Sequence, residues 1–393
     1  MISRPVISIQ LIVAYNGGDQ DRSERENMIP FELNRLGMIM APEPGNSLEV
    51  EGVLNPGVAR GPDGNVYIFP RMVAAGNYSR IGIARVRFNK AGDPEGVERL
   101  GVALEPEAEY EKRPDGGGCE DPRITFVEPL ASYVMTYTAF SAAGPRIALA
   151  ISKDLFNWER IGLATFEPYN GLDFNGIDNK DAVLFPVAIS DVEGVPALAM
   201  IHRPLFPGTE PHETVQEPVS REMDIHRESM WISYSPLDKG EYSYRHLHRF
   251  ESHHRLACPV AYWERLKIGG GTPPVLTRHG WLLIYHGVCD TPGESAAGKR
   301  LRYSAGAFVL SREHPRFIQY RSSLPILSPE LPPERDGAVA NVVFPTGLDQ
   351  RKDLGQPERI DVYYGMADSR IGAASMRLPD ELLSEFHAPS CEE

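Results

Sequence analysis

Cysteine is scarce in this sequence, and long apolar runs are missing. The four cysteines among 393 residues show neither C-x-x-C spacing nor a dense framework, which argues against a disulfide scaffold and favours a reducing, cytoplasmic compartment. No apolar run is long enough to cross a bilayer. The apolar segment 5–15 alternates like a strand and lacks a cleavage site, so it is not expected to be a signal peptide. We expect a cytoplasmic protein without a membrane partner.

Positive charge is also in deficit. The chain has 40 lysines and arginines against 54 aspartates and glutamates, which gives a formal net charge of -14. Such a surface repels nucleic acid and anionic membranes, so neither is expected as a partner. An anionic substrate would need a local basic pocket inside this acidic protein. Buried arginines and lysines are therefore the informative residues.

Helical periodicity is scarce too, and short β-branched and aromatic runs separated by turn residues dominate. The clear helix candidate is the C-terminal segment 379–387. Five strand-rich units, at intervals of roughly 60 to 90 residues, each open with a polar residue or phenylalanine beside or shortly before proline. These openings are Asn55, Asp121, Lys180, Thr272 and Phe344. The pattern predicts an all-β, five-bladed propeller as a single domain over 1–393, with an N-terminal extension at 1–35 and a long loop insertion at 203–228.

A propeller brings the first strand of every blade to its central channel. Asn55, Asp121, Lys180 and Asp181 stand at the starts of such predicted strands. Although they are far apart in sequence, we expect them to share one site at the channel mouth.

The densest chemical signal is the segment 116–123, Gly-Gly-Gly-Cys-Glu-Asp-Pro-Arg. Its glycines would let the backbone approach a ligand closely. Glu120 and Asp121 should point to opposite faces of a strand, so only one of them should face the channel. Arg123 is suited to holding a carboxylate through two hydrogen bonds. A solvated acidic turn is the alternative interpretation of the same residues.

Basic residues accompany these predicted strands. Lys180 stands directly before a buried strand, where it is either a point charge for phosphate or a strand-edge gatekeeper. Arg71 follows a predicted strand and, taken alone, is typical of a surface arginine. Further basic candidates with weaker individual claims are Arg60, Arg146, Arg160 and Arg203.

Three other features have simpler interpretations. The segment 269–272 lacks the lysine and spacing of a phosphate-binding loop and is read as a turn. The histidines within 246–254 lack the neighbouring cysteines or helical spacing of a metal site, so no metal is expected. Glu228 and Glu264 are possible second carboxylates for glycoside chemistry, although most such acids are solvated.

Six motifs in order resemble glycoside hydrolase family 130, and together they run from about residue 36 to about residue 376. Each motif is modest alone, but six in the family's order are specific. They are segments 55–57, 118–123, 180–186, 267–274, 280–287 and 363–368.

The resemblance implies a five-bladed propeller enzyme, in a family of β-mannoside phosphorylases with β-mannosidases as a minority. It assigns the catalytic role to Asp121, contact with the cleaved sugar to Asn55, and binding of sugar hydroxyls to Asp368. Glu120, Arg123 and Asp181 lie in or beside the same motifs and are further candidates for substrate binding. The residues that match the family's phosphate ligands, or stand where phosphate or sugar contacts are expected, are Arg71, Lys180, Arg160, His286 and Tyr303.

The resulting hypothesis is an inverting phosphorylase that cleaves β-linked mannosides with inorganic phosphate to give α-mannose 1-phosphate. Phosphate is the co-substrate, no further cofactor is expected, and a homo-oligomer is possible. One alternative is an inverting β-mannosidase in which Glu228 or Glu264 activates water. Another is a non-catalytic carbohydrate-binding propeller that keeps platforms such as Trp281 and Tyr285. The insertion at 203–228 lies outside the recognised motifs, so the leaving sugar stays open.

Overall fold

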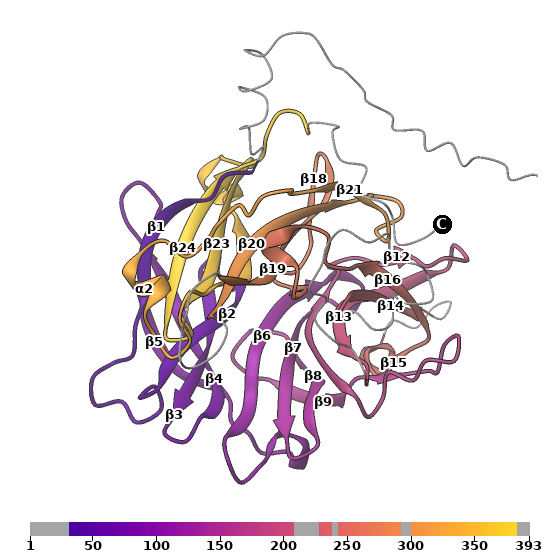
Figure 1. Cartoon of the computed structure of the whole chain (residues 1–393), viewed down its shortest axis with the longest axis horizontal. Helices are drawn as coiled ribbons and strands as arrows, with labels where there is room; N and C mark the ends of the chain where they lie inside the picture. Colours follow the sequence, from indigo (N-terminus) through magenta and orange to yellow (C-terminus); the bar gives the residue numbers. More distant parts are fainter. Residues whose placement is uncertain (1–30, 208–227, 238–242, 292–299, 383–393) are drawn as a thin grey trace, which may run out of the picture.

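The structure, a computed structural model, describes residues 31–207, 228–237, 243–291 and 300–382. Most of their strands group into five four-stranded antiparallel blades, and a short parallel pairing of β4 (Tyr78–Phe88) with β6 (Gly117–Val127) joins the first two blades into one sheet. Figure 1 shows the sheets following one another in chain order around a common centre. This arrangement is a five-bladed β-propeller, as the sequence predicted.

Each blade is named here by its place in the chain, and its strands are given from the inside outward. Blade 1 contains β2 (Gly52–Arg60), β3 (Val66–Ala74), β4 (Tyr78–Phe88) and β5 (Pro94–Leu104). Blade 2 contains β6 (Gly117–Val127), β7 (Ser132–Ser141), β8 (Gly144–Ser152) and β9 (Glu159–Leu163). Blade 3 contains β11 (Asp178–Leu184), β13 (Pro196–Leu205), β14 (Met230–Pro236) and β16 (Ser252–Ala257).

Blade 4 contains β17 (Lys267–Gly270), β19 (Gly280–Thr291), β20 (Arg300–Leu310) and β21 (Ile318–Arg321). Blade 5 contains β22 (Val343–Gln350), β23 (Arg359–Met366), β24 (Arg370–Arg377) and β1 (Asn34–Met40). Short strands supplement this plan: β12 (Ile189–Ser190), β18 (Val275–Thr277), and a parallel pair of β10 (Thr165–Phe166) with β15 (Arg249–Phe250). The helical turns are η1 (Glu109–Glu111), η2 (Glu128–Leu130), η4 (Tyr244–Leu247), η5 (Tyr262–Glu264), α2 (Pro332–Arg335) and η6 (Lys352–Leu354).

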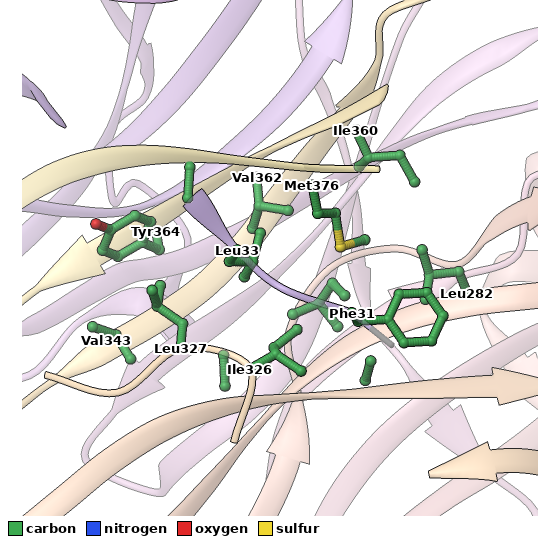
Figure 2. Close-up of a cluster of buried hydrophobic side chains, with 14 of the residues drawn as sticks. Phe31, Leu33, Leu282, Ile326, Leu327, Val343, Ile360, Val362, Tyr364 and Met376 are labelled. Carbon is green, nitrogen blue, oxygen red and sulfur yellow. The ribbon is translucent and has the colours of Figure 1, made fainter. Parts of the chain in front are cut away.

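The last blade is completed by the first strand of the described chain. Strand β1 pairs antiparallel with β24. Phe31 and Leu33, which precede β1, are buried in the core between blades 4 and 5. Figure 2 shows Phe31 against Leu282 of β19 and Leu33 beside Val362 of β23. Burying side chains of this size stabilises a fold by about 1.5 to 3 kcal/mol each. Residues 31–35 therefore belong to blade 5, and the predicted N-terminal extension at 1–35 reached too far.

Two other predicted boundaries differ from the structure. Residues 203–205 are the end of strand β13, so the predicted insertion begins too early, and residues 208–227 lie outside the described residues. The predicted C-terminal helix at 379–387 falls mostly outside them as well, and the described residues 379–382 are not helical. Within the described ranges, no helix is long and apolar enough to cross a membrane.

A buried glutamate anchors the connection into blade 2. Glu111 in η1 accepts hydrogen bonds from the backbone N–H groups of residues 107 and 108 at 2.8 and 2.9 Å. Its other partners are the hydroxyl of Tyr137 on β7, at 2.6 Å, and Nε of Arg160 on β9, at 2.9 Å. One carboxylate thus ties the incoming turn to the second and fourth strands of the blade.

The same arrangement of a glutamate, a tyrosine and an arginine recurs in blades 4 and 5, although no repeated sequence motif predicted it. In each case a glutamate on a helical turn accepts two backbone N–H groups, a tyrosine hydroxyl from the second strand and an arginine from the fourth. The sets are Glu264 with Tyr285 and Arg321, and Glu334 with Tyr364 and Arg35. In blade 1, Glu49 pairs with Arg99 of β5 in a related way. We call these sets glutamate anchors.

Candidate active site

Three inner strands bulge at equivalent places, and each bulge carries an asparagine or an aspartate. Asn55 in β2, Asp121 in β6 and Asp181 in β11 have φ angles of 45°, 46° and 58°. The strand register skips at each of these residues. Asparagine and aspartate tolerate this left-handed conformation better than most residues, which explains their recurrence. The bulges re-aim side chains of three blades toward the channel.

The bulge in β6 overturns one prediction. Glu120 and Asp121 were expected on opposite faces of a regular strand, but both line the same pocket. The pocket has a volume of about 150 Å³ and lies among the inner strands. Its lining residues are Asn55, Arg71, Glu120, Asp121, Lys180, Asp181, Arg203, Lys267, His286, Tyr303, Val342, Phe344 and Asp368. The structure therefore brings together nine of the eleven residues assigned a site role from the sequence, and also Arg203, which had only a weak claim.

One side of the pocket is rich in carboxylates. Nδ2 of Asn55 donates to Oδ1 of Asp121 over 2.9 Å. Arg71 donates from Nη2 to Glu120 over 2.8 Å, and its Nη1 lies 3.4 Å from Oδ1 of Asp121. Burial raises the pKa of Glu120 even though Arg71 opposes this change. Burial and the negative charge of Asp121 raise the pKa of Asp368 to about 6.

Another part of the pocket carries two lysines without anionic partners. Neither the Lys180 nor the Lys267 ammonium group forms a hydrogen bond or an ion pair with any residue in the described part of the chain. Nζ of Lys267 lies 5.4 Å from the centre of the Tyr303 ring. Burial, together with the charge of Arg203, lowers the pKa of Lys267. A bound anion would neutralise the positive charge of these lysines.

Arg203 adds a third cation, but it is already paired. Its Nε donates to Asp181 over 2.8 Å and its Nη1 donates to Glu228 over 2.5 Å. Burial alone would raise the pKa of Asp181, but Arg203 and the other nearby cations hold it well below its usual range. Lys180 and Arg203 are direct partners across β11 and β13, and both line the pocket.

His286 lines the pocket as a neutral group. It is almost fully buried, and its ring lies 4.4 Å from that of Phe344. Burial lowers the pKa of His286 to about 3, despite a carboxylate oxygen of Asp181 lying 3.8 Å from Nε2. At neutral pH His286 can donate or accept a hydrogen bond but supplies no positive charge.

Arg123 lies behind the pocket wall instead of facing a ligand. Its guanidinium donates to the backbone carbonyls of Gly270, Gly271 and Asp121 at 3.1, 3.2 and 2.9 Å. It also lies 3.4 Å from Asp181. With its side chain only 1% exposed, Arg123 joins the inner strands of blades 2, 3 and 4 and has no free face for a substrate carboxylate.

Arg160, predicted among the phosphate contacts, does not line the pocket. The glutamate anchor of blade 2 holds it, with Nε on Glu111 at 2.9 Å and Nη1 on Glu107 at 3.3 Å. Glu264 is likewise bound within the glutamate anchor of blade 4, where it accepts a hydrogen bond from Tyr285, and it is fully buried. Glu228 lies near the pocket, but its carboxylate binds Arg203.

Both glycine runs serve packing between strands. A side chain at Gly117 or Gly118 would collide with the backbone carbonyls of Phe140 and Ser79. These glycines therefore allow neighbouring strands to pack closely, whereas the sequence predicted close approach to a ligand. Residues 267–270 form the inner strand β17, not the predicted turn. A side chain at Gly269 would collide with His286 and with the Asp181 carboxylate.

Sequence reasoning missed Lys267 and Phe344 as pocket residues and gave Arg203 only a weak claim. Lys267 stood at the start of a recognised motif, which was the available signal. Arg203 was obscured because it was assigned to a loop. Within the described ranges, no group of three His, Cys, Asp or Glu side chains is placed to hold a metal ion.

The inner strands of the propeller thus converge on a pocket that holds several carboxylates and two lysines whose ammonium groups form no ion pair with the described residues. The family model described as beta-1,4-mannooligosaccharide phosphorylase matches residues 22–384. The chain belongs to this family, glycoside hydrolase family 130, which confirms the resemblance drawn from the six motifs.

The relatives match between two thirds and nine tenths of the chain. A 1,2-beta-oligomannan phosphorylase from Thermoanaerobacter sp. (strain X514) is 31% identical over 359 residues, which are 89% of this chain and 99% of that protein. A beta-1,4-mannooligosaccharide phosphorylase from Ruminococcus albus is 30% identical over 66% of this chain and 63% of its own length. The structure of beta-1,2-mannobiose phosphorylase from Listeria innocua, in complex with beta-1,2-mannobiose, has the same fold, with a TM-score of 0.62 and 24% identity over 86% of this chain and 94% of that one.

Proposed function

We propose that the protein is an inverting phosphorylase that cleaves β-linked mannosides with inorganic phosphate and releases α-mannose 1-phosphate. The observation that carries the proposal is the pair of lysines, Lys180 and Lys267, left without anionic partners in a pocket that also holds the Asp121 carboxyl. The activities of the relatives support the same reaction. A phosphorylase needs cations that hold phosphate near the anomeric carbon, and it needs one acid for the leaving oxygen.

The proposed roles follow from this division of the pocket. Asp121 supplies the proton to the departing oxygen, directly or through a sugar hydroxyl, and Asn55 fixes the orientation of its carboxyl group. Asp368 and Glu120 accept hydrogen bonds from sugar hydroxyls. Arg71 is paired with the carboxylates of Glu120 and Asp121, so we assign its charge to orienting these two acids.

Phosphate is assigned to the other side. Lys180 and Lys267 provide the charge that Asp181 and Glu228 do not already neutralise. The hydroxyl of Tyr303 and the neutral ring of His286 add hydrogen bonds without charge. Inversion requires the dianion to attack the anomeric carbon from the face opposite the acid, and we assign that face to these cations.

Hydrolysis finds weaker support because it needs a second carboxylate that is free to activate water. Glu264 is fully buried and bound by Tyr285 and Arg321. Glu228 is the more accessible of the two, with 18% of its side chain exposed, but it is paired with Arg203. Under the hydrolase alternative Glu228→Gln would abolish turnover in the absence of phosphate.

The proposal extends to the setting of the reaction. We place the enzyme in the cytoplasm, with the whole chain acting as one catalytic domain and with phosphate as the single co-substrate. The scarcity of cysteines supports the compartment. A homo-oligomer is compatible with the proposal and is tested by sedimentation.

The experiment compares β-1,2- and β-1,4-manno-oligosaccharides with and without phosphate and follows the products by ¹H and ³¹P NMR. Both linkages are included because the relatives named above act on both. Phosphate-dependent release of mannose 1-phosphate in the α configuration supports the proposal. Release of free mannose at the same rate without phosphate contradicts it and favours hydrolysis.

A further inference from the structure

Blade 3 has two buried histidines at positions where blades 2, 4 and 5 have the tyrosine and the arginine of a glutamate anchor. His202 on β13 lies opposite the bulge of the inner strand, the position that Tyr137 occupies on β7. His253 stands on the fourth strand, as the anchor arginines do. Both rings are buried among aromatic side chains, with Phe174 in contact with each.

These residues form a continuous hydrogen-bonded chain. Nδ1 of His202 lies 3.0 Å from Oδ1 of Asn179, and its Nε2 lies 2.7 Å from Oγ of Ser233. Nδ1 of His253 lies 2.8 Å from the same Oγ, and its Nε2 lies 3.0 Å from the backbone carbonyl of Glu167. We call Asn179, His202, Ser233 and His253 the blade 3 chain.

Counting hydrogens shows that this arrangement requires one extra proton. With an amide oxygen on Nδ1 of His202 and a carbonyl on Nε2 of His253, both of these nitrogens must carry hydrogen. In two neutral rings the nitrogens that face Ser233 are then both acceptors. The hydroxyl of Ser233 has a single hydrogen and satisfies only one of them. The contacts are complete only when one ring is doubly protonated.

A half-turn of the Asn179 amide gives a second complete arrangement without the extra proton. The amide nitrogen of Asn179, buried and without a partner in the described residues, then donates to Nδ1 of His202. His202 donates from Nε2 to Ser233, and Ser233 donates to Nδ1 of His253. Nε2 of His253 still donates to the backbone carbonyl. All the contacts of the chain are then satisfied with neutral rings.

We propose that the blade 3 chain is a one-proton switch in which protonation of His253 reverses the hydrogen bonds of Ser233 and His202 and turns the Asn179 amide. The added proton is balanced along the chain. His253 gains hydrogen on Nδ1, the hydroxyl of Ser233 turns to Nε2 of His202, and the hydrogen of His202 moves from Nε2 to Nδ1. A second proton has no place, because Ser233 would then face two donors and its own hydrogen would lack an acceptor.

The charge rests on His253 because its surroundings favour it there. Burial lowers its pKa to about 4, but the backbone carbonyl and the carboxylate of Glu167 oppose that change, and His254 reinforces it. His202 has no such support: burial lowers its pKa well below the usual range, and a charge on His253 lowers it further. The other rings packed against the two histidines belong to Phe166, Phe174 and Tyr169.

The switch lies next to the proposed phosphate subsite. Asn179 and Asp181 flank Lys180 on β11, and each is bound to β13, Asn179 through His202 and Asp181 through Arg203. Reversal of the chain therefore acts on one of the two side chains that fix the strand on either side of Lys180. The switch itself does not depend on the reaction that the pocket performs.

Histidine-selective ¹⁵N NMR tests the switch, since it distinguishes the two neutral tautomers from the doubly protonated ring. Signals among the 11 histidines are assigned with His202→Gln and His253→Gln. At neutral pH both rings are expected in the Nε2–H form. On acidification His253 becomes doubly protonated, and His202 changes to the Nδ1–H form at the same midpoint without gaining charge.

Two variants sharpen the test. Asn179→Asp offers only acceptors to His202 and is expected to hold it in the Nδ1–H form already at neutral pH. Ser233→Ala interrupts the chain, so the tautomer of His202 no longer follows the titration of His253. The proposal is overturned if wild-type His202 is in the Nδ1–H form at neutral pH, or if it keeps one tautomer while His253 titrates. The neutral-pH measurement suffices alone if the protein unfolds in acid.

Discussion

Asn55 and Asp121 meet across two blades: Nδ2 of the asparagine donates to Oδ1 of the aspartate over 2.9 Å. Both residues sit in strand bulges with positive φ, so the backbone holds each end of this contact. The same carboxylate oxygen lies 3.4 Å from Nη1 of Arg71. The contact leaves Oδ2 of Asp121 without a hydrogen bond to the described residues, and this is the oxygen we assign to proton transfer.

Replacing Asp121 with asparagine keeps the shape of the side chain but removes the proton donor. We expect turnover of manno-oligosaccharides to fall by about 10²- to 10⁴-fold, the usual contribution of a general acid. The melting temperature should change little. Steady-state kinetics measure the effect, and Asp115→Asn, an exposed aspartate shortly before the same strand, is the matched control. Turnover that stayed within twofold of wild type would remove Asp121 from the mechanism.

Replacing Lys180 or Lys267 with methionine should act on phosphate more than on the sugar. Each substitution removes a charge that has no anionic partner in the described residues, so folding loses little. We expect the KM for phosphate to rise about tenfold or more for each, since an ion-paired hydrogen bond stabilises by about 1.5 to 3 kcal/mol. Lys90→Met, at an exposed position, is the control. An unchanged KM for phosphate in both variants would contradict the assigned subsite.

Arg160→Met should affect stability and not phosphate binding. The substitution leaves Glu111 buried without its cation, and breaking a buried ion pair costs about 3 to 5 kcal/mol. Urea unfolding measures the loss, and the KM for phosphate should stay at its wild-type value. Arg85→Met, which breaks an exposed pair with Glu98, serves as control and should hardly change stability. A raised KM for phosphate with unchanged stability would restore Arg160 to the site.

Acid should destabilise blade 3 through its buried histidines. Burial lowers the pKa of His253 from its ordinary 6.5 to about 4, so the neutral ring is favoured in the folded state. Its contribution is fully present above about pH 6.5 and is lost as the pH falls toward 4. We expect the free energy of unfolding to fall across this window, and His253→Gln to flatten the fall. Equal pH dependence in the variant and wild type would assign the acid sensitivity elsewhere.

Much of the fold and part of the site could be predicted from the sequence. Asn55, Asp121 and Lys180 were placed together because propeller geometry sends the first strand of each blade to one channel. The pairing of Glu120 with Asp121 was predicted wrongly because strand alternation fails at a bulge, and a bulge depends on the backbone conformation of Asp121.

Long-range partners explain the other errors. Arg160 and Arg71 are both arginines near predicted strands, and the local sequence does not distinguish their roles. Arg160 stabilises its blade because it pairs with the buried Glu111 of a preceding turn. Lys267 reaches the pocket because Gly269 and Gly270 let β17 pack closely against Asp181. Such contacts join residues of different blades and leave no local pattern to read.

The most direct test of the phosphate subsite is a crystal structure of the enzyme with mannose and inorganic phosphate. We predict an anion within about 3 Å of the ammonium groups of Lys180 and Lys267, across the sugar ring from the carboxyl group of Asp121. A fully occupied phosphate bound anywhere else, with a sugar present beside Asp121 and both ammonium groups still unpaired, would contradict phosphate-dependent cleavage at this site.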